Sequence, residues 1–380
     1  MSEEVRLFRR VDLASLDWPH TPDGDYARRY LVPFMEDGPQ KYIRNVYNTE
    51  MLIAKVGEAI LPLTVTDFHP DNSFTCSPYS HYVSYGGFEE VLRLKNPVLE
   101  TLIKLLVIPL AAYFYRSDFD RVVYVNNWLL STNLYPPISR EGLGVLAREL
   151  PYWFPDRAIV FRSVDTVGNP LIYNTLIKLG SEMVLSRQVW YQNPEEAQHK
   201  KQFKVDRSTQ RRSAYEVVEG NGLTEQELHR ALELYNQLYL TKYSRYNPQY
   251  TEGFIKLARD QELLHLKGLR RGEKLNGIMG YFIRSGLMTQ PMFGYDIKLP
   301  QKEGLYRILS LLTIQEGLSR GLKVHASAGV GKFKKLRGGE SVIEYNAVFD
   351  RHLPLYRQLL WRLMKRISDL LVPFFKRNDF

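Results

Sequence analysis

The order of predicted elements repeats along the chain, and this repetition limits how the chain can fold. Two apolar runs within residues 51–66 flank Gly57-Glu58 and predict a β-hairpin, which a strand at 79–85 and a helix follow. The second half repeats this plan with a hairpin at 263–284, a strand at 288–295 and another helix. A duplicated set of strands and helices indicates a mixed α/β architecture with two sheet-containing halves.

Polar residues between the two halves predict a linker. Residues 192–212 are rich in Lys, Arg, Gln and Glu. Thr224 followed by Glu227 forms a capping box, which predicts the helix that opens the second half. We therefore predict an N-terminal domain at 1–195, a linker at 196–222 and a C-terminal domain at 223–380.

The net charge of the chain indicates what kind of partner it binds, but not which reaction it catalyses. Its 380 residues carry a net charge of +9, which favours an anionic partner such as nucleic acid, a phosphorylated cofactor or a membrane surface. Cys76 is the single cysteine, so we expect neither a disulfide nor a cysteine-rich metal cluster. No signal peptide is evident, and the most apolar run, 102–115, is shorter than the roughly 20 residues that span a bilayer. We expect a cytoplasmic protein with no transmembrane segment and no metal.

A glycine-rich, cationic stretch at residues 329–339 lies between two strand-like runs. Glycines there let the backbone approach a ligand closely. Its cations suit an anionic ligand or a charge that develops during a reaction, and a solvated basic loop is the alternative interpretation. The cations are Lys332, Lys334, Lys335 and Arg337.

The turn at residues 301–306 is similar to the Q-x-x-G-x-G/A turn of the acetyltransferase-like fold usually called GNAT. Gln301 and Gly304 match that pattern, whereas Tyr306 replaces its last small residue. The resemblance implies an α/β (α+β) chain of two GNAT-like domains, each a mixed, mostly antiparallel sheet flanked by helices. It also implies that a coenzyme A pyrophosphate binds this turn, and a helix N-terminus beside Lys302 suits such a group or the phosphates of a tRNA acceptor end.

Residues 333–339 resemble the signature of the Fem family, a Phe-Lys pair followed by two glycines. That family transfers amino acids from aminoacyl-tRNA onto peptidoglycan precursors. The resemblance implies that Lys334 assists acyl transfer from a C-terminal catalytic domain, with Phe333 and Arg337 beside the donor. Arg337 stands where the family often has an aromatic residue, and the coiled-coil arm of the family is not evident here.

Two further groups complete the predicted site. Tyr295 and Asp296 end the strand before the phosphate turn, where a general base or an acceptor contact would lie, although Tyr295 is as readily explained by packing. An aromatic and basic cluster precedes Pro248 and either contacts the acceptor or forms a packed corner between helices. The predicted catalytic residues are Lys334, Tyr295 and Asp296, the donor-binding residues are Gln301, Lys302, Gly304, Tyr306, Phe333 and Arg337, and the acceptor-binding residues are Tyr243, Arg245 and Tyr246.

These residues predict an N-acyltransferase in which an amine of a small-molecule or peptide-like acceptor attacks an activated acyl or aminoacyl donor directly. The donor, aminoacyl-tRNA, acyl-CoA or an acyl group on a carrier protein, is a co-substrate, and no tightly bound cofactor is expected. Sequences typical of zinc peptidases, nucleophile elbows and P-loops do not occur. The alternative hypothesis is a non-catalytic RNA-binding or scaffold protein that retains the fold.

Overall fold

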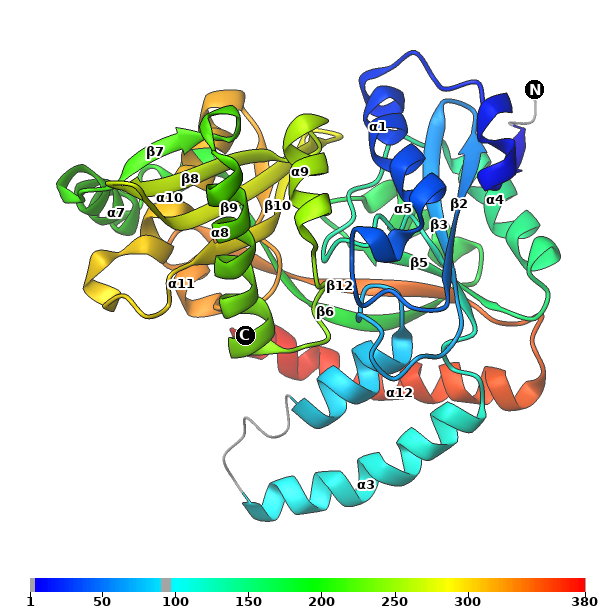
Figure 1. The fold of residues 1–380 in the computed structure, drawn as a ribbon. Coiled ribbons are helices and arrows are strands. Elements are labelled where there is room, and N and C mark those ends of the chain that lie inside the picture. The colour runs from blue at the N-terminus through cyan, green and yellow to red at the C-terminus, as the bar shows by residue number, and fades with distance from the viewer. Residues whose placement is uncertain (1–3, 90–96, 380) are drawn as a thin grey trace.

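The computed structural model describes residues 4–89 and 97–379, and its strands form one twelve-stranded sheet with the order β1-β2-β3-β4-β5-β12-β6-β11-β10-β9-β8-β7 (Figure 1). The strands of the first half are β1 Val5–Phe8, β2 Thr49–Val56, β3 Ala59–Thr66, β4 Val122–Val125, β5 Ala158–Val164 and β6 Glu182–Gln192. Those of the second half are β7 Glu216–Glu219, β8 His265–Arg271, β9 Lys274–Arg284, β10 Leu287–Tyr295, β11 Lys323–His325 and β12 Gly339–Phe349. The longer helices are α1 Pro22–Asp37, α3 Pro97–Arg116, α4 Arg140–Trp153, α5 Pro170–Lys178, α7 Lys201–Arg212, α8 Glu225–Asn236, α9 Glu252–Asp260, α10 Leu305–Arg320 and α12 Leu355–Arg377.

The last strand joins the two halves into this one sheet. β12 lies between β5 and β6 of the first half, with Phe349 opposite Ile159 and Gly339 opposite Gln192. β6 in turn pairs with β11 through Tyr191 and His325. The predicted α/β class with a mostly antiparallel sheet is confirmed, and the two halves contribute their strands to a single sheet.

Each half contains one parallel strand pair joined by a helix. β4 and β5 are parallel from Val122–Ala158 to Val125–Phe161, with α4 between them in sequence. β10 and β11 are parallel only from Leu287–Lys323 to Thr289–His325, with α10 between them. Beyond His325 the β11 ladder ends while β10 continues to Tyr295, so the sheet opens at this point.

The duplicated plan is therefore real, but the strand predicted at residues 79–85 is wrong. This segment is a π-helix, η3 Tyr79–Glu89, and the counterpart of β10 is β4. The backbone N–H groups of Ser80 and His81 bond to Ser77, and that of Tyr79 donates to the Asp120 carboxylate at 2.7 Å. Because these groups satisfy the first N–H donors of a helix, the segment winds rather than extends.

The first 40 residues, whose turn signals at 19–24 and 37–39 predict irregular structure, contain α1. The Thr21 side chain accepts a hydrogen bond from the Gly24 N–H at 3.0 Å, and Pro22 occupies the first helical position. Proline and a hydroxyl cap are the residues that start a helix, so the turn signals mark its N-terminus. The same chemistry confirms the predicted capping box of Thr224 and Glu227 at α8.

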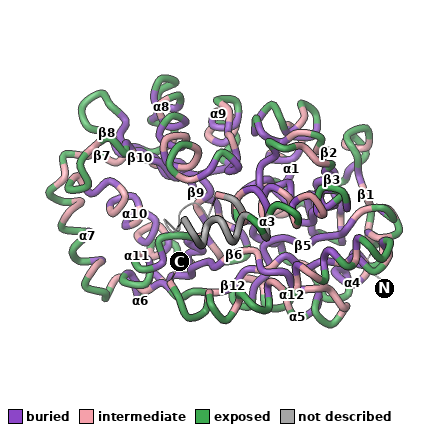
Figure 2. The backbone as a smooth tube through the Cα atoms, turned by 90° about the horizontal axis from the view of Figure 1, so that it is seen from below, coloured by how far each residue is buried: buried purple, intermediate pink, exposed green. Residues whose placement is uncertain are grey.

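Residues 196–222, where the sequence predicts a linker, contain the helix α7 and the edge strand β7. Phe203 of α7 is buried against Leu311 and Ile314 of α10. β7 pairs with β8 and ends the sheet. The polar composition of this segment therefore reflects a helix with a narrow buried face. Figure 2 shows the exposed residues of α7 at the outer edge of the molecule.

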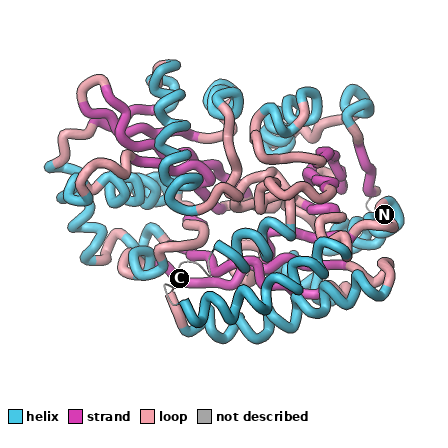
Figure 3. Tube along the Cα trace, turned by 60° about the horizontal axis from the view of Figure 1, so that its bottom comes forward, coloured by secondary structure: helices cyan, strands magenta, loops and turns pink. Residues whose placement is uncertain are grey.

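The helices cover both faces of the sheet (Figure 3). One core cluster draws side chains from both halves, among them Trp128 of the first half and Phe282 of the second. Arg284 reinforces this contact, because its guanidinium lies 4.1 Å from the Trp128 ring centroid and pairs with Asp23 at 2.9 Å. The two halves therefore share a core as well as a sheet. None of the helices described is at once long and apolar enough to cross a membrane.

Candidate active site

Lys334 is the predicted catalytic residue whose surroundings differ most from those of a solvated lysine. It lies in the short helix α11 Gly331–Lys335, which follows two left-handed residues, Gly329 and Val330, and it is 6% exposed. Its Nζ donates to the carbonyl oxygens of Ser327 at 3.0 Å and Ala328 at 2.8 Å. Burial, assisted by the charge of Arg187, lowers the pKa of Lys334 to about 7. The lysine therefore changes protonation state near neutral pH.

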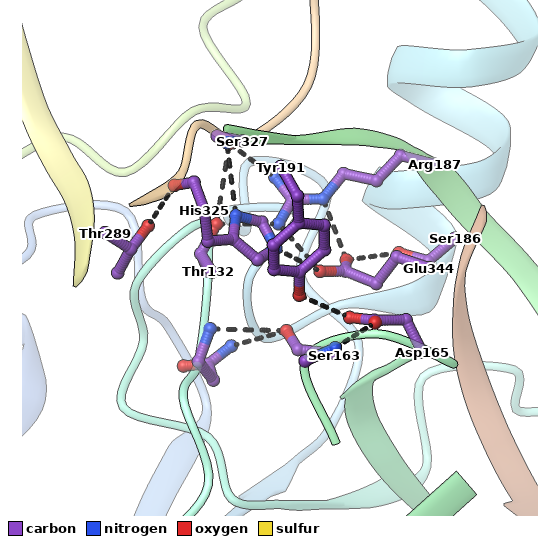
Figure 4. A network of polar contacts seen from close by, with 12 residues as sticks. Thr132, Ser163, Asp165, Ser186, Arg187, Tyr191, Thr289, His325, Ser327 and Glu344 are labelled. Carbon is purple, nitrogen blue, oxygen red and sulfur yellow. Dashed lines mark hydrogen bonds and ion pairs between the residues drawn. The ribbon is translucent and has the colours of Figure 1, made fainter. Parts of the chain in front are cut away.

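Arg187, whose charge contributes to the low pKa of Lys334, forms an ion pair with the buried carboxylate of Glu344 (Figure 4). Arg187 Nε lies 2.8 Å from Glu344 Oε1, and Nη2 lies 3.1 Å from Oε2. Burial by itself would raise the pKa of Glu344, but the charge and hydrogen bonds of Arg187 hold it below its usual value. A bidentate pair fixes the orientation of both side chains, which come from the neighbouring strands β6 and β12.

The same guanidinium joins loops from both halves. Arg187 Nη2 donates to Thr132 Oγ1 at 2.9 Å, and Nη1 donates to Ser327 Oγ at 3.2 Å. Thr132 follows β4 of the first half, whereas Ser327 follows β11 of the second and contributes one of the carbonyl acceptors of Lys334. Arg187 is therefore tied by hydrogen bonds to the loop that holds the lysine.

His325 and Tyr191 complete this polar group. Burial lowers the pKa of His325 to about 4, so its ring is neutral, and its Nδ1 accepts the Ser327 N–H at 3.1 Å. The Tyr191 hydroxyl donates to Asp165 at 2.8 Å, and its ring meets that of His325 edge-on at 4.7 Å. A narrow polar cavity at the junction of the halves is lined by Thr132, Asn133, Leu134, Tyr135, Ser163, Asp165, Gly168, Asn169, Tyr191, Arg284, Ser285, Leu287 and His325.

The predicted donor turn begins α10 but faces another helix. Gln301 and Lys302 are exposed in a short 3-10 helix, and Gly304 caps α10 with φ +71°. A Cβ at Gly304 would lie 2.7 Å from the Thr209 methyl of α7. The turn therefore needs glycine for its backbone conformation and for its contact with α7.

Tyr306 and Phe333 lie together beside the opening of the sheet. Their rings are 4.6 Å apart, and Tyr306 also contacts Tyr295 at 5.8 Å between ring centroids. Burial, followed by the influence of Tyr243, raises the pKa of Tyr295. The structure thus brings one predicted catalytic residue and two predicted donor residues into a single aromatic cluster.

Arg337 anchors α7 rather than facing solvent. It is 4% exposed, and its Nε and Nη2 donate to Asp206 of α7 at 2.7 and 3.1 Å. Its guanidinium also stacks on Phe333, 3.3 Å from the ring centroid. Arg337 therefore fixes α7 beside α11.

Asp296 lies away from Lys334 in a separate ion-pair network. Its carboxylate accepts from Arg230 at 2.8 Å, lies 3.4 Å from Lys274 Nζ and accepts the Lys298 N–H at 3.1 Å. It is 4% exposed. These contacts describe a carboxylate that holds α8 against the end of β10.

The predicted acceptor residues separate into two places. Tyr243 ends a second π-helix, η5 Gln237–Tyr243, 6.0 Å from the Tyr239 ring. Arg245 is paired with Asp71 at 3.4 Å, and the Tyr246 carbonyl accepts the Phe74 N–H at 2.9 Å. Arg245 and Tyr246 therefore belong to a turn that packs on the first half.

Sequence reasoning missed Arg187, Thr132 and the role of Glu344. Arg187 and Glu344 stand within otherwise β-rich runs, and a charged residue inside a buried strand is a signal that can be read from sequence. The sequence did not predict that these two residues pair, because β12, near the end of the chain, lies beside β6 of the first half only in the folded sheet.

A basic surface extends along α7, next to α11. Its exposed charged side chains are all cations, and they form no ion pair with any residue in the described ranges. We call it the α7 basic surface, and it consists of Lys200, Lys201, Lys204, Arg207, Arg211 and Arg212. Within the same ranges, no group of His, Cys, Asp or Glu side chains is arranged to hold a metal ion.

Comparison with known proteins gives a fold but no sequence relative. No family model matches the chain, and no curated protein matches its sequence. The crystal structure of FemX matches with a TM-score of 0.50 and 9% identity over 84% of this chain and 91% of that one. A tandem GNAT protein from the clavulanic acid biosynthesis pathway matches with a TM-score of 0.39 and 12% identity over 90% and 98% of the two chains. A conserved protein of unknown function from Bacteroides thetaiotaomicron VPI-5482 matches with a TM-score of 0.48 and 9% identity over 91% and 99%.

The FemX comparison covers 84% of this chain, so it extends over both halves. It confirms the fold expected from the resemblance noted in the sequence, and at 9% identity it extends to the fold alone. The chain therefore has the overall fold of FemX, with a buried lysine, a buried glutamate and a partly buried arginine at the junction of its halves.

Proposed function

We propose that this protein is an N-acyltransferase that moves an acyl or aminoacyl group from an activated donor to an amine, with Lys334 as the catalytic residue. The observation that carries the proposal is the hydrogen bonding of Lys334 Nζ. An ammonium has three protons, and two of them are directed to the carbonyls of Ser327 and Ala328. The third has no acceptor within the described residues and is available to a substrate.

In a direct attack by an amine, the third proton of Lys334 can stabilise the negative charge that develops on the carbonyl oxygen of the donor. The amine nitrogen bonds to the acyl carbon, the bond to the ester oxygen or thioester sulfur breaks, and the proton lost by the amine passes to the leaving group. Between these events the carbonyl oxygen carries negative charge. A preorganised N–H donor in a site of low dielectric stabilises that charge, typically by a factor of about 10² to 10³ in rate.

The α7 basic surface favours aminoacyl-tRNA over acyl-CoA as the donor. It places a row of unpaired cations beside α11, and phosphates along an RNA backbone are the ligands that such a row suits. The turn at Gly304 is packed against Thr209, which leaves less room there for a compact pyrophosphate. The acceptor is an amine of a small molecule or a peptide-like molecule.

Titration of the purified protein with bulk tRNA and with coenzyme A, each at two salt concentrations, tests the donor. We expect tRNA binding that weakens steeply with salt, and a shallower salt dependence in Lys204→Gln/Arg207→Gln. Arg140→Gln/Arg148→Gln, which removes two exposed cations of α4, is the matched control and should bind as the unaltered protein does. Saturable coenzyme A binding with no tRNA binding would mean that the donor is an acyl-CoA rather than an aminoacyl-tRNA.

The α7 basic surface also suits the second candidate function, a non-catalytic RNA-binding protein. The two candidates differ in the fate of the donor. Bulk tRNA charged with radiolabelled amino acids, incubated with the protein and a mixture of primary amines, should yield labelled amides. RNA binding without any labelled amide from that mixture would favour the second candidate.

A further inference from the structure

The outer surface of α12 is unusual for a helix packed on a sheet. Its inner side buries Leu360, Trp361 and Met364 in the core below the sheet. Its outer side, together with that of α3, exposes large apolar residues among cations. We call this the α3–α12 face, and it is formed by Leu105, Ile108, Leu355, Leu359, Arg362, Arg366, Leu370, Lys376 and Arg377.

Each apolar side chain of this face is more than half exposed to solvent. Leu370 is 78% exposed, Leu355 69% and Leu105 64%. Scattered exposed leucines are normal, but several on one face mark a surface that is covered by a partner. Leu355 and Leu359 are four residues apart and so lie on the same side of α12.

Cations continue the same stripe. Arg362, Arg366 and Leu370 follow Leu359 at steps of three or four residues, so leucines and arginines share one side of the helix. Arg362, Arg366, Lys376 and Arg377 form no ion pair with the described residues. The one acidic residue of α12, Asp369, pairs with Lys365.

α3 widens this stripe into a two-helix face. Tyr113 of α3 donates from its hydroxyl to the Tyr356 carbonyl at 2.9 Å, so the helices are neighbours. Phe119, which follows α3, lies 4.7 Å from the Trp361 ring and seats both helices on the same core. Figure 1 shows them on the same side of the molecule, with Leu105 and Ile108 adding exposed apolar area on α3.

We propose that the α3–α12 face docks on an anionic lipid bilayer, with both helices lying in the plane of the membrane surface. Exposed leucines enter the boundary of the acyl chains, and the interleaved arginines meet anionic headgroups. Neither helix can span the membrane. A bilayer fits this face better than an acidic protein does, because exposed leucines and arginines lie on the same side of α12 instead of forming separate apolar and charged patches.

Flotation with phosphatidylcholine vesicles, with and without about a third of phosphatidylglycerol, tests the proposal. The protein should float with the anionic vesicles at low salt and much less with the neutral ones. Arg362→Glu/Arg366→Glu and Leu359→Ser/Leu370→Ser should each weaken binding by roughly tenfold or more. Val11→Ser and Tyr152→Ser, at exposed positions elsewhere in the first half, are matched controls that should bind as the unaltered protein does.

The outcomes separate the alternatives. All altered residues are exposed, so the midpoint of thermal unfolding should stay within a few degrees in each variant. Absence of flotation with anionic vesicles at low salt, or full flotation of both double variants, would overturn the proposal. A dimer in solution that Leu359→Ser/Leu370→Ser converts to a monomer, without vesicle binding, would assign the face to a second copy of the chain instead.

Discussion

Each half of the molecule buries a guanidinium group near its parallel strand pair, and the two groups are held in different ways. In the first half, Arg162 of β5 donates from Nη1 to Asn127 Oδ1 at 2.6 Å and to the Thr75 carbonyl at 3.0 Å. In the second half, Arg337 forms a bidentate pair with the carboxylate of Asp206. Neutral oxygens from loops of the same half surround Arg162, whereas Arg337 binds a helix that carries a basic surface.

The two arginines also differ in what they connect. Arg162 joins the loops after β3 and β4 through the Thr75 carbonyl and the Asn127 side chain. Arg337, which follows α11, pairs with Asp206 of α7 and stacks on Phe333, whose ring contacts Tyr306. The same strand plan thus holds one arginine between loops of the first half and the other between Phe333 and the helix that carries the α7 basic surface.

Asp206→Ala should have the largest effect, because it leaves Arg337 charged and buried without a counter-charge. Loss of one partner of a buried ion pair costs about 3–5 kcal/mol of unfolding free energy. Denaturant unfolding measures this change. Glu195→Ala, at an exposed position shortly before α7, is the control and should change stability by less than about 0.5 kcal/mol. A similarly small effect of Asp206→Ala would remove the distinction between the two guanidinium groups.

Lys334→Ala should reduce the rate of amide formation by about 10² or more while donor affinity stays within a few-fold. The reason is that its free proton acts on the charge that develops in the transition state. Single-turnover transfer and donor titration measure the two quantities separately. Lys335→Ala, whose lysine is exposed and paired with Asp379, serves as the control. If both variants transfer equally well, Lys334 is a structural lysine.

Arg162→Leu should lower the unfolding free energy by about 1–3 kcal/mol, less than Asp206→Ala, because it leaves neutral acceptors unpaired rather than a charge. The transfer rate of the folded variant should remain close to that of the unaltered protein. Arg148→Leu, at an exposed position of α4, is the control for stability. A loss of transfer in folded Arg162→Leu would mean that the loops joined by Arg162 take part in the reaction.

The smallest effect concerns pH. Burial lowers the pKa of Lys334 to about 7, so its protonated form is lost as pH rises above that value. The transfer rate constant, measured at saturating donor and acceptor, should therefore fall severalfold between about pH 6 and pH 8. Lys334→Arg keeps its charge and should not show this fall, whatever its absolute rate. A rate that rises through this range would assign the neutral amine of Lys334 as a base.

The sequence alone predicted most helices and strands, because their hydrophobic periodicity and caps are local. Thr224 with Glu227 and the strands β8 to β12 are examples. It failed at residues 79–85, where tyrosines and a valine suggest a strand, because the capping contact comes from Asp120, which is distant in sequence. The resemblance at residues 333–339 pointed to Lys334 without giving any of its partners.

The tertiary structure decided which residues surround that lysine. Arg187, Thr132 and Glu344 lie on three segments that are well separated in sequence and meet only because β12 crosses into the first half. Strand pairing between distant segments depends on the register of the whole sheet, which no local pattern encodes. Local sequence thus determined the helices and strands and indicated Lys334. Long-range strand pairing determined the burial that lowers the pKa of this lysine.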